Sequence, residues 1–276
     1  QMKESWVYQS KIQNYKRTRR YTEMRTSHSK VFDTKWNIVV NLGIKCNTLG
    51  ISRDAGVRYF SSPFDNMDTV EGLVETSHLI STKFVNYFSD IKMWNIRNEI
   101  APRSSVIRNK IIWHKDTPNV YYPHFADSWF ENSITKKELH EWKTTSNLNI
   151  EFIWSNFKRI FENRQKRLIN HLENKNKILF FRADEPRQLR RVYSTNQNKH
   201  LQEFISKIQL AFPKTEVGLM YLYCNNSKYK RNLISSESIY TECIPADVDT
   251  ASYCTEILKK LKLLPVDDVN EAMLNV

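Results

Sequence analysis

Two strongly apolar segments in the second half of the chain, residues 177–184 and 216–224, flank an amphipathic segment at 200–212. A strand that is apolar along its whole length is covered on both faces of its sheet, and helical spacing of apolar residues predicts a helix between the two strands. Strands that are joined through a helix pair in parallel. The order therefore predicts an α/β fold with a largely parallel central sheet flanked by helices.

Residues 36–46 predict a further buried strand that turns into a helix. A continuous β-branched run ends at Gly43, and the residues after Cys46 suit a short helix bounded by Gly56. A thiol in the first turn of a helix lies near the positive end of the helix dipole, which favours the nucleophilic thiolate. The alternative is that Cys46 is a small buried apolar residue.

Length and composition limit the class of protein. The 276 residues are 40% hydrophobic and 12% aromatic, as in a folded globule that can bury a core. Neither a G-x-G-x-x-G nor a G-x-x-x-x-G-K-[ST] pattern occurs, so no nucleotide fingerprint supports dehydrogenase or P-loop chemistry. No apolar run is long enough to predict a transmembrane segment. We expect a basic aromatic arm at 1–30, one α/β domain at 31–262 and an acidic tail at 263–276.

The positive charge is concentrated near the N-terminus. The net charge is +12, and residues 1–30 carry eight Lys and Arg against two Glu, which is half of the excess. This balance predicts an anionic partner, either a phosphorylated donor, a glycan or a nucleic acid. Aromatic residues interleave with the basic residues of the arm, which suits docking on another domain or subunit, or RNA binding by phosphate contacts and stacking.

The four cysteines stand at positions 46, 224, 243 and 254, without C-x-x-C spacing or a histidine at ligand distance. This spacing argues against a zinc site and against a disulfide scaffold, so we expect no metal. A reducing compartment, the cytoplasm or another intracellular one, is the predicted location.

The longest predicted helix covers residues 150–174, where apolar residues recur at helical spacing. Arg164 falls on its apolar stripe. A buried guanidinium needs a carboxylate, a carbonyl or a ligand phosphate as partner, whereas a long side chain can instead reach the surface.

The remaining segments give weaker patterns. We expect helices at 69–76, 80–88, 134–143 and 250–262, a strand near 238–244, and an irregular segment at 92–116. Residues 120–125 predict a short strand that ends at His124, near Asp127. That histidine is either functional or a hydrogen-bonded residue at the end of a strand.

Several of these pieces occur in a recognisable order. Leu-Gly-x-x-Cys at 42–46 is followed by Ser-Pro-Phe-Asp at 62–65, an aromatic-flanked His124, Arg-x-x-Arg-Leu at 164–168 and Ile-Leu-Phe-Phe-Arg at 178–182. This order resembles a bacterial family of unknown function described as papain-like cysteine peptidases, related to papain-like capsule-biosynthesis acyltransferases. The resemblance spans roughly residues 36 to 224.

The resemblance implies Cys46 as the nucleophile and His124 as its general base. Peptide hydrolysis and acyl transfer from coenzyme A, for example onto a polysaccharide, both need this pair and donors for the oxyanion. Asp127, or in second place Asp65, would orient the imidazole. Three arginines, Arg164, Arg167 and Arg182, would suit the phosphates of such a donor.

The chain also departs from the family pattern around the predicted site. Asn41 stands where a Ser usually precedes Leu-Gly, Asn66 where a Trp usually follows Pro-Phe-Asp, and Phe125 separates His124 from the usual Asp. The alternative function is therefore a catalytically inactive relative that serves as a structural or interaction subunit of a larger assembly, one containing RNA if the arm binds it.

Overall fold

The computed structural model describes the backbone of thirteen segments: 30–43, 45–57, 61–65, 68–69, 73–85, 87, 91–95, 110–114, 120–121, 150–174, 176–184, 197–225 and 232–264. Side chains are described in the same segments except at 45–49, 68–69, 91–95, 110–114, 120–121 and 150–157. The predicted arm and tail lie almost entirely outside these residues, as do the helix predicted at 134–143 and the candidate site residues His124 and Asp127.

The central sheet has four parallel strands in the order β2 (Ile38–Asn41), β7 (Lys177–Ala183), β8 (Glu216–Cys224) and β9 (Ile239–Ile244). All neighbouring pairs are parallel, so the carboxyl ends of the four strands lie at one edge. Helix α7 (Gln197–Ala211) connects β7 to β8. The predicted mixed α/β fold with a parallel sheet flanked by helices is confirmed.

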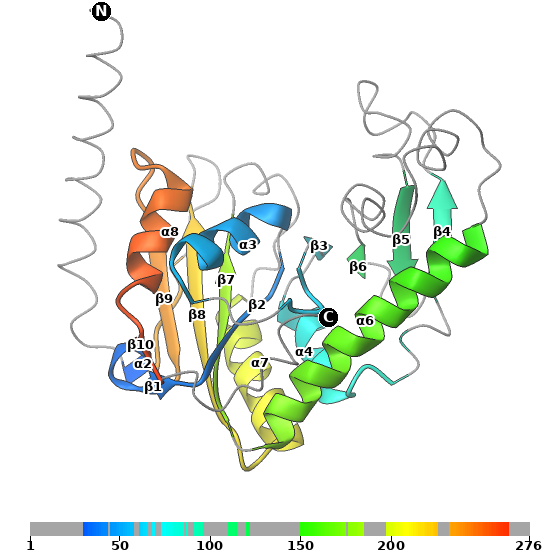
Figure 1. Cartoon of the computed structure of the whole chain (residues 1–276). Helices are drawn as coiled ribbons and strands as arrows, with labels where there is room; N and C mark the ends of the chain where they lie inside the picture. Colours follow the sequence, from blue (N-terminus) through cyan, green and yellow to red (C-terminus); the bar gives the residue numbers. More distant parts are fainter. Residues whose placement is uncertain are drawn as a thin grey trace, which may run out of the picture.

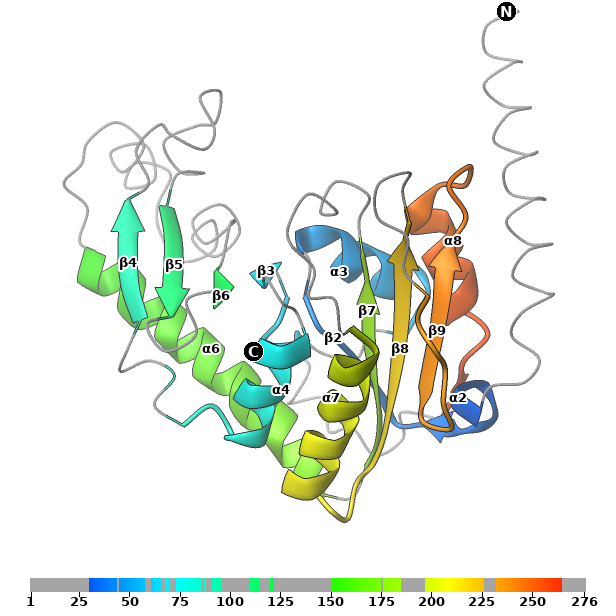
Figure 2. The same cartoon turned by 180° about the vertical axis from the view of Figure 1, so that it is seen from behind.

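Helices cover both faces of this sheet (Figures 1 and 2). Successive residues of β7 alternate between two cores, with Ile178 and Phe180 in one and Leu179 and Phe181 in the other. The first core includes residues of α4 (Leu73–Ser81), α6 (Ile150–Glu173) and α7, and the second includes residues of α2 (Lys30–Asp33), α3 (Lys45–Asp54) and α8 (Thr250–Leu258). The continuous apolar run of β7 follows from this double burial.

A short second sheet joins distant parts of the chain. Strand β1 (Lys35–Trp36) pairs in parallel with β10 (Lys262–Leu263), which lies where the sequence predicted the end of a helix. The indole of Trp36 is buried and donates a hydrogen bond to the Val31 carbonyl at 2.7 Å. A Cβ atom at Gly218 would lie 2.5 Å from Cη2 of Trp36, so only glycine leaves room for this ring.

A third, antiparallel sheet has the strand order β3 (Asp68–Thr69), β6 (Val120–Tyr121), β5 (Lys110–His114) and β4 (Ile91–Asn95). The prediction of an irregular segment at 92–116 was therefore wrong at both of its ends. Strands β4 and β5 pair with each other over five residues. Consecutive apolar residues, Met93-Trp94 in β4 and Ile111-Ile112-Trp113 in β5, break the alternation of apolar and polar residues, which hid both strands from a periodicity argument.

The helix predicted at 80–88 was also wrong. Helix α4 ends at Ser81, and the chain then turns through Lys83 and Phe84, whose φ angles are 53° and 57°. Positive φ is unfavourable for these residue types. The rings of Phe84 and Tyr87 are both buried and meet edge to face at 6.0 Å, and this burial offsets the strain.

Candidate functional site

The turn between β2 and α3 carries the predicted nucleophile. The Leu42 amide donates to the Phe181 carbonyl at 2.9 Å, so the ladder with β7 continues one residue past the strand. Gly43 then adopts a φ of 78°, which favours glycine, and α3 begins at Lys45. Cys46 is therefore the second residue of a helix that starts at the carboxyl edge of a parallel sheet, where ligands bind in many α/β proteins. The structure describes Cys46 through its backbone only.

Buried polar side chains hold this turn from the side of the sheet. Arg182 of β7 donates from Nη1 to the Leu42 carbonyl at 3.2 Å, and its Nε lies 3.7 Å from Oδ1 of Asp184. The Tyr221 hydroxyl donates to Oδ2 of Asp184 at 2.8 Å. The side chains of Arg182 and Asp184 are 3% and 0% exposed, so this is a fully buried charge pair. Its guanidinium supports the backbone immediately before Gly43.

The loop at 61–65 holds the turn from the other side. The Ser62 hydroxyl donates to the Asn41 carbonyl at 3.1 Å, and the Ser62 amide donates to Oδ2 of Asp65 at 2.9 Å. Arg164 of α6 donates from Nη1 to the Ser62 carbonyl at 3.3 Å. A backbone carbonyl is therefore one partner of the Arg164 guanidinium. The structure thus brings Asp65, Arg164 and Arg182 together around the turn before α3.

Asn41, the last residue of β2, is the polar side chain that sequence reasoning noted only as a departure from a pattern. It is 4% exposed, and its Nδ2 donates to the Ser52 hydroxyl at 2.8 Å. Its Oδ1 is buried and has no hydrogen-bond partner among the residues that the structure describes. A buried acceptor without a partner is unfavourable, and it marks a place where a donor from another group can bind. The polar residue at the end of an otherwise apolar strand was the only sequence signal for it.

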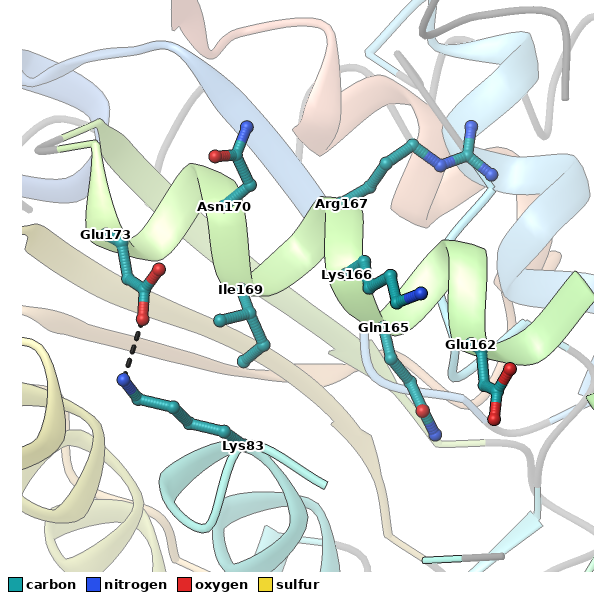
Figure 3. A pocket seen from close by; sticks show the side chains of 8 residues that line it. All are labelled: Lys83, Glu162, Gln165, Lys166, Arg167, Ile169, Asn170 and Glu173. Atoms are coloured by element: carbon teal, nitrogen blue, oxygen red, sulfur yellow. Dashed lines mark hydrogen bonds and ion pairs between the residues drawn. The ribbon is translucent and has the colours of Figure 1, made fainter. Parts of the chain in front are cut away.

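The third predicted arginine lies apart from the other two. Arg167 is half-buried and donates from Nε to the Asn163 carbonyl of its own helix at 3.4 Å. It lines a groove of about 720 Å³ between α6 and the turn after α4 (Figure 3). Burial lowers the pKa of Arg167, and burial followed by the charge of Arg167 lowers the pKa of the nearby His171. The predicted arginine cluster is therefore divided between the turn and this groove.

The other thiols occupy settings unlike the start of a helix. Cys224 and Cys254 are buried and Cys243 is partly buried, and none of the three forms a disulfide within the described residues. Burial, and after it the neighbouring Cys224, raises the pKa of the Cys254 thiol well above its usual range. Cys254 is therefore protonated at neutral pH, and protonated thiols are poor nucleophiles.

The described segments contain no group of three or more His, Cys, Asp and Glu side chains that is placed to hold a metal ion. Within the same segments, none of the helices combines the length and the apolar character that crossing a bilayer requires.

Comparison with protein-family models, with curated proteins and with solved structures found no match to this chain. The family resemblance inferred from the order of the motifs therefore stays a prediction.

Proposed function

We propose that this protein is a papain-like cysteine hydrolase or acyltransferase that uses Cys46 as nucleophile and His124 as general base. The observation that carries the proposal is the position of Cys46 at the start of α3, after a turn whose two preceding carbonyls are held by side chains. The Asn41 carbonyl accepts from Ser62, and the Leu42 carbonyl accepts from Arg182. A nucleophile needs such a fixed backbone, because small displacements reduce the rate of attack strongly.

In the proposed reaction the Cys46 sulfur attacks a carbonyl carbon while the thiol proton passes to the imidazole of His124. The imidazole then gives this proton to the leaving group, which is the amine of a peptide or the thiolate of coenzyme A, and an acyl-thioester remains on Cys46. Water releases the acid in a hydrolase, and a hydroxyl of a glycan accepts the acyl group in a transferase. Amides in the first turn of α3 would donate to the oxyanion.

The unpartnered Oδ1 of Asn41 supports a site at this turn. It lies five positions before Cys46 and can accept a hydrogen bond from an imidazole N–H or from the N–H of a peptide substrate. Asp127 remains our first choice for orienting His124. The carboxylate of Asp65 already accepts the Ser62 amide, so we assign to it the support of the loop at 61–65.

The proposed acyl donor of the transferase is coenzyme A. Arg164 and Arg182 donate to backbone carbonyls around the turn, so we assign them to its support before any contact with phosphate. Arg167 is the predicted phosphate-binding arginine that stands away from the turn. The basic arm at 1–30 is proposed to dock on another domain or subunit.

The proposal is tested by alkylating the full chain with iodoacetamide at pH 7 and following each cysteine by mass spectrometry. We expect Cys46 to react at least about ten times faster than the partly buried Cys243, because a helix N-terminus and an adjacent base favour the thiolate. His124→Gln should shift the reactivity of Cys46 to higher pH. Cys254, which is buried, is the internal control for an unreactive thiol.

If Cys46 reacts no faster than Cys243, thiol chemistry at this site has to be abandoned. The alternative of an inactive structural or interaction subunit would then take its place.

A further inference from the structure

A buried amide on α6 has no hydrogen-bond partner. Phe161, Leu168 and Leu172 form the side of α6 that packs in the core, and Gln165 falls on the same stripe. Gln165 is 7% exposed, and within the described part of the chain its Nε2 has no hydrogen-bond partner. A buried donor without a partner is destabilising, so a glutamine persists at such a position at a cost to the fold. A ligand that accepts this hydrogen bond would account for it.

Gln165 lines the groove between α6 and the turn after α4. In Figure 3, Gln165 and Ile169 extend from α6 on the side where Lys83 lies, whereas Arg167 and Asn170 extend from the other side of the helix. The volume of about 720 Å³ is within the range of small-molecule sites, roughly 300–1,000 Å³. The groove is large enough for a ligand that reaches the amide.

The charges of the lining leave positive groups in excess. Glu173 is 2.7 Å from Lys83, and Glu162 is 3.8 Å from Lys158, so each carboxylate has a lysine beside it. No described residue forms an ion pair or hydrogen bond with Lys166, which directly follows Gln165 in the sequence. An amide donor and an ammonium group at adjacent positions are both suited to an acceptor that is negatively charged.

A second cation lies at the edge of the same groove. Arg167 also lines the groove, and burial lowers its pKa. A water molecule could accept the hydrogen bond of Gln165, but it would not compensate the charge of Lys166. An anion does both.

We propose that the groove formed by Gln165, Lys166 and Lys83 binds a small molecule through an anionic oxygen group, a phosphate or a carboxylate. The amide of Gln165 donates to one oxygen of this group, and Lys166 provides the opposite charge. The proposal does not depend on the chemistry of Cys46, and it can hold or fail independently of it.

The test is a titration of the full chain, labelled with ¹⁵N, with sodium phosphate and separately with sodium acetate at constant ionic strength. The probes are the side-chain amide resonances of Gln165 and Asn170, which both line the groove. We expect saturable shifts of both. Saturation with phosphate alone identifies a phosphate site, and saturation with acetate as well identifies a site that also accepts carboxylates.

Variants locate the site. Gln165→Met removes the amide with little change in volume, and Lys166→Gln removes the ammonium on the exposed side of the helix. Each should weaken binding about ten-fold, measured through Asn170, because each loses a hydrogen bond to a charged group. Lys259→Gln at the C-cap of α8, at the opposite face of the sheet, is the charge-matched control and should bind as the unmodified chain does.

Two results would overturn the proposal. One is an absence of saturable shifts with either anion, which would leave water as the partner of the amide. The other is equal affinity in the unmodified chain and in Gln165→Met. Urea unfolding of Gln165→Met is the control for folding. We expect this variant to be more stable than the unmodified chain, so that a loss of binding is not a loss of fold.

Discussion

The turn before α3 and the groove along α6 each contain a buried amide with one unpartnered atom, Oδ1 of Asn41 and Nε2 of Gln165. Their surroundings differ. At the turn, the charged pair of Arg182 and Asp184 is at most 3% exposed. In the groove, the pair of Lys83 and Glu173 is half exposed.

This difference in burial distinguishes side chains that support the backbone from side chains that can bind a ligand. At the turn, the buried Arg182 donates to the Leu42 carbonyl, so it fixes the position of the chain and is covered from a ligand in solution. The pair of Lys83 and Glu173 in the groove is a direct contact that is half exposed to water, so a ligand can replace either partner at small cost. The arginines of the one predicted cluster therefore lie in different surroundings in the two regions.

The largest expected effect is on stability at the turn. Arg182→Met leaves the carboxylate of Asp184 buried without its cation, and we expect the free energy of unfolding to fall by about 3–5 kcal/mol. Lys83→Met in the groove should cost less than about 1 kcal/mol, because its pair is exposed to water. Urea unfolding measures both. Similar losses for the two variants would contradict the contrast between buried support and exposed pairs.

The next largest effect on stability is expected at Gly43, the glycine of the turn. Gly43→Ala forces a Cβ into a φ of 78° and should cost about 1–2 kcal/mol in unfolding free energy. Gly56→Ala is the matched control, because Gly56 has a φ of 72° and open space around it. We expect similar losses of stability, but slower alkylation of Cys46 only in Gly43→Ala. Unchanged alkylation in Gly43→Ala would show that the turn does not position the thiol.

Apolar replacement of the two amides that have an unpartnered atom should change the free energy of unfolding in opposite directions. Gln165→Met removes a buried donor that has no partner and should stabilise the fold by about 1 kcal/mol. Asn41→Leu also removes the hydrogen bond to Ser52 and should destabilise it by about 1 kcal/mol. Both are measured by urea unfolding in a buffer without phosphate or carboxylate. Destabilisation by Gln165→Met would show that the amide has a partner in solution.

The smallest effect concerns pH. Burial and the charge of Arg167 lower the pKa of His171 below its ordinary value of 6.5, so the folded state binds its proton less readily than the unfolded chain. The contribution of His171 to stability is therefore present above pH 6.5, and it falls as pH drops from there toward the folded-state pKa. His171→Gln should reduce the fall in stability over this range.

An NMR titration of the imidazole sharpens the same test. Arg167→Gln should raise the pKa of His171 toward its ordinary value, because one of the two causes of the shift is removed. An unchanged pKa in this variant would assign the shift to burial alone.

Several elements were predicted closely, because their patterns are local. Strand β8 has the predicted bounds, Glu216–Cys224, and α6 covers Ile150–Glu173 against a predicted 150–174. The apolar run from Val217 to Cys224 and an apolar stripe along a 24-residue helix are strong periodic signals. Strands β4 and β10 were missed because β4 has no such period and β10 has only two residues, Lys262–Leu263.

The candidate site was predictable only in part. Gly43 and the position of Cys46 after a buried strand could be inferred from neighbouring residues, as could the turn that contains Asp65. The unpartnered atoms of Asn41 and Gln165 could not be inferred from the sequence. Whether a buried amide is paired depends on which side chains of other segments reach it, and no spacing along the chain encodes this.

The sequence by itself determined the central strands, the helix after Gly43 and the parallel pairing of the strands, because apolar periodicity and glycine conformation act within a few residues. Only the tertiary structure decided what the arginines do. Arg164 donates to Ser62, 102 positions away, and Arg182 donates to Leu42, 140 positions away. A guanidinium can bind a phosphate or a carbonyl equally well, and the choice follows from which backbone the packing of helices and strands brings beside it.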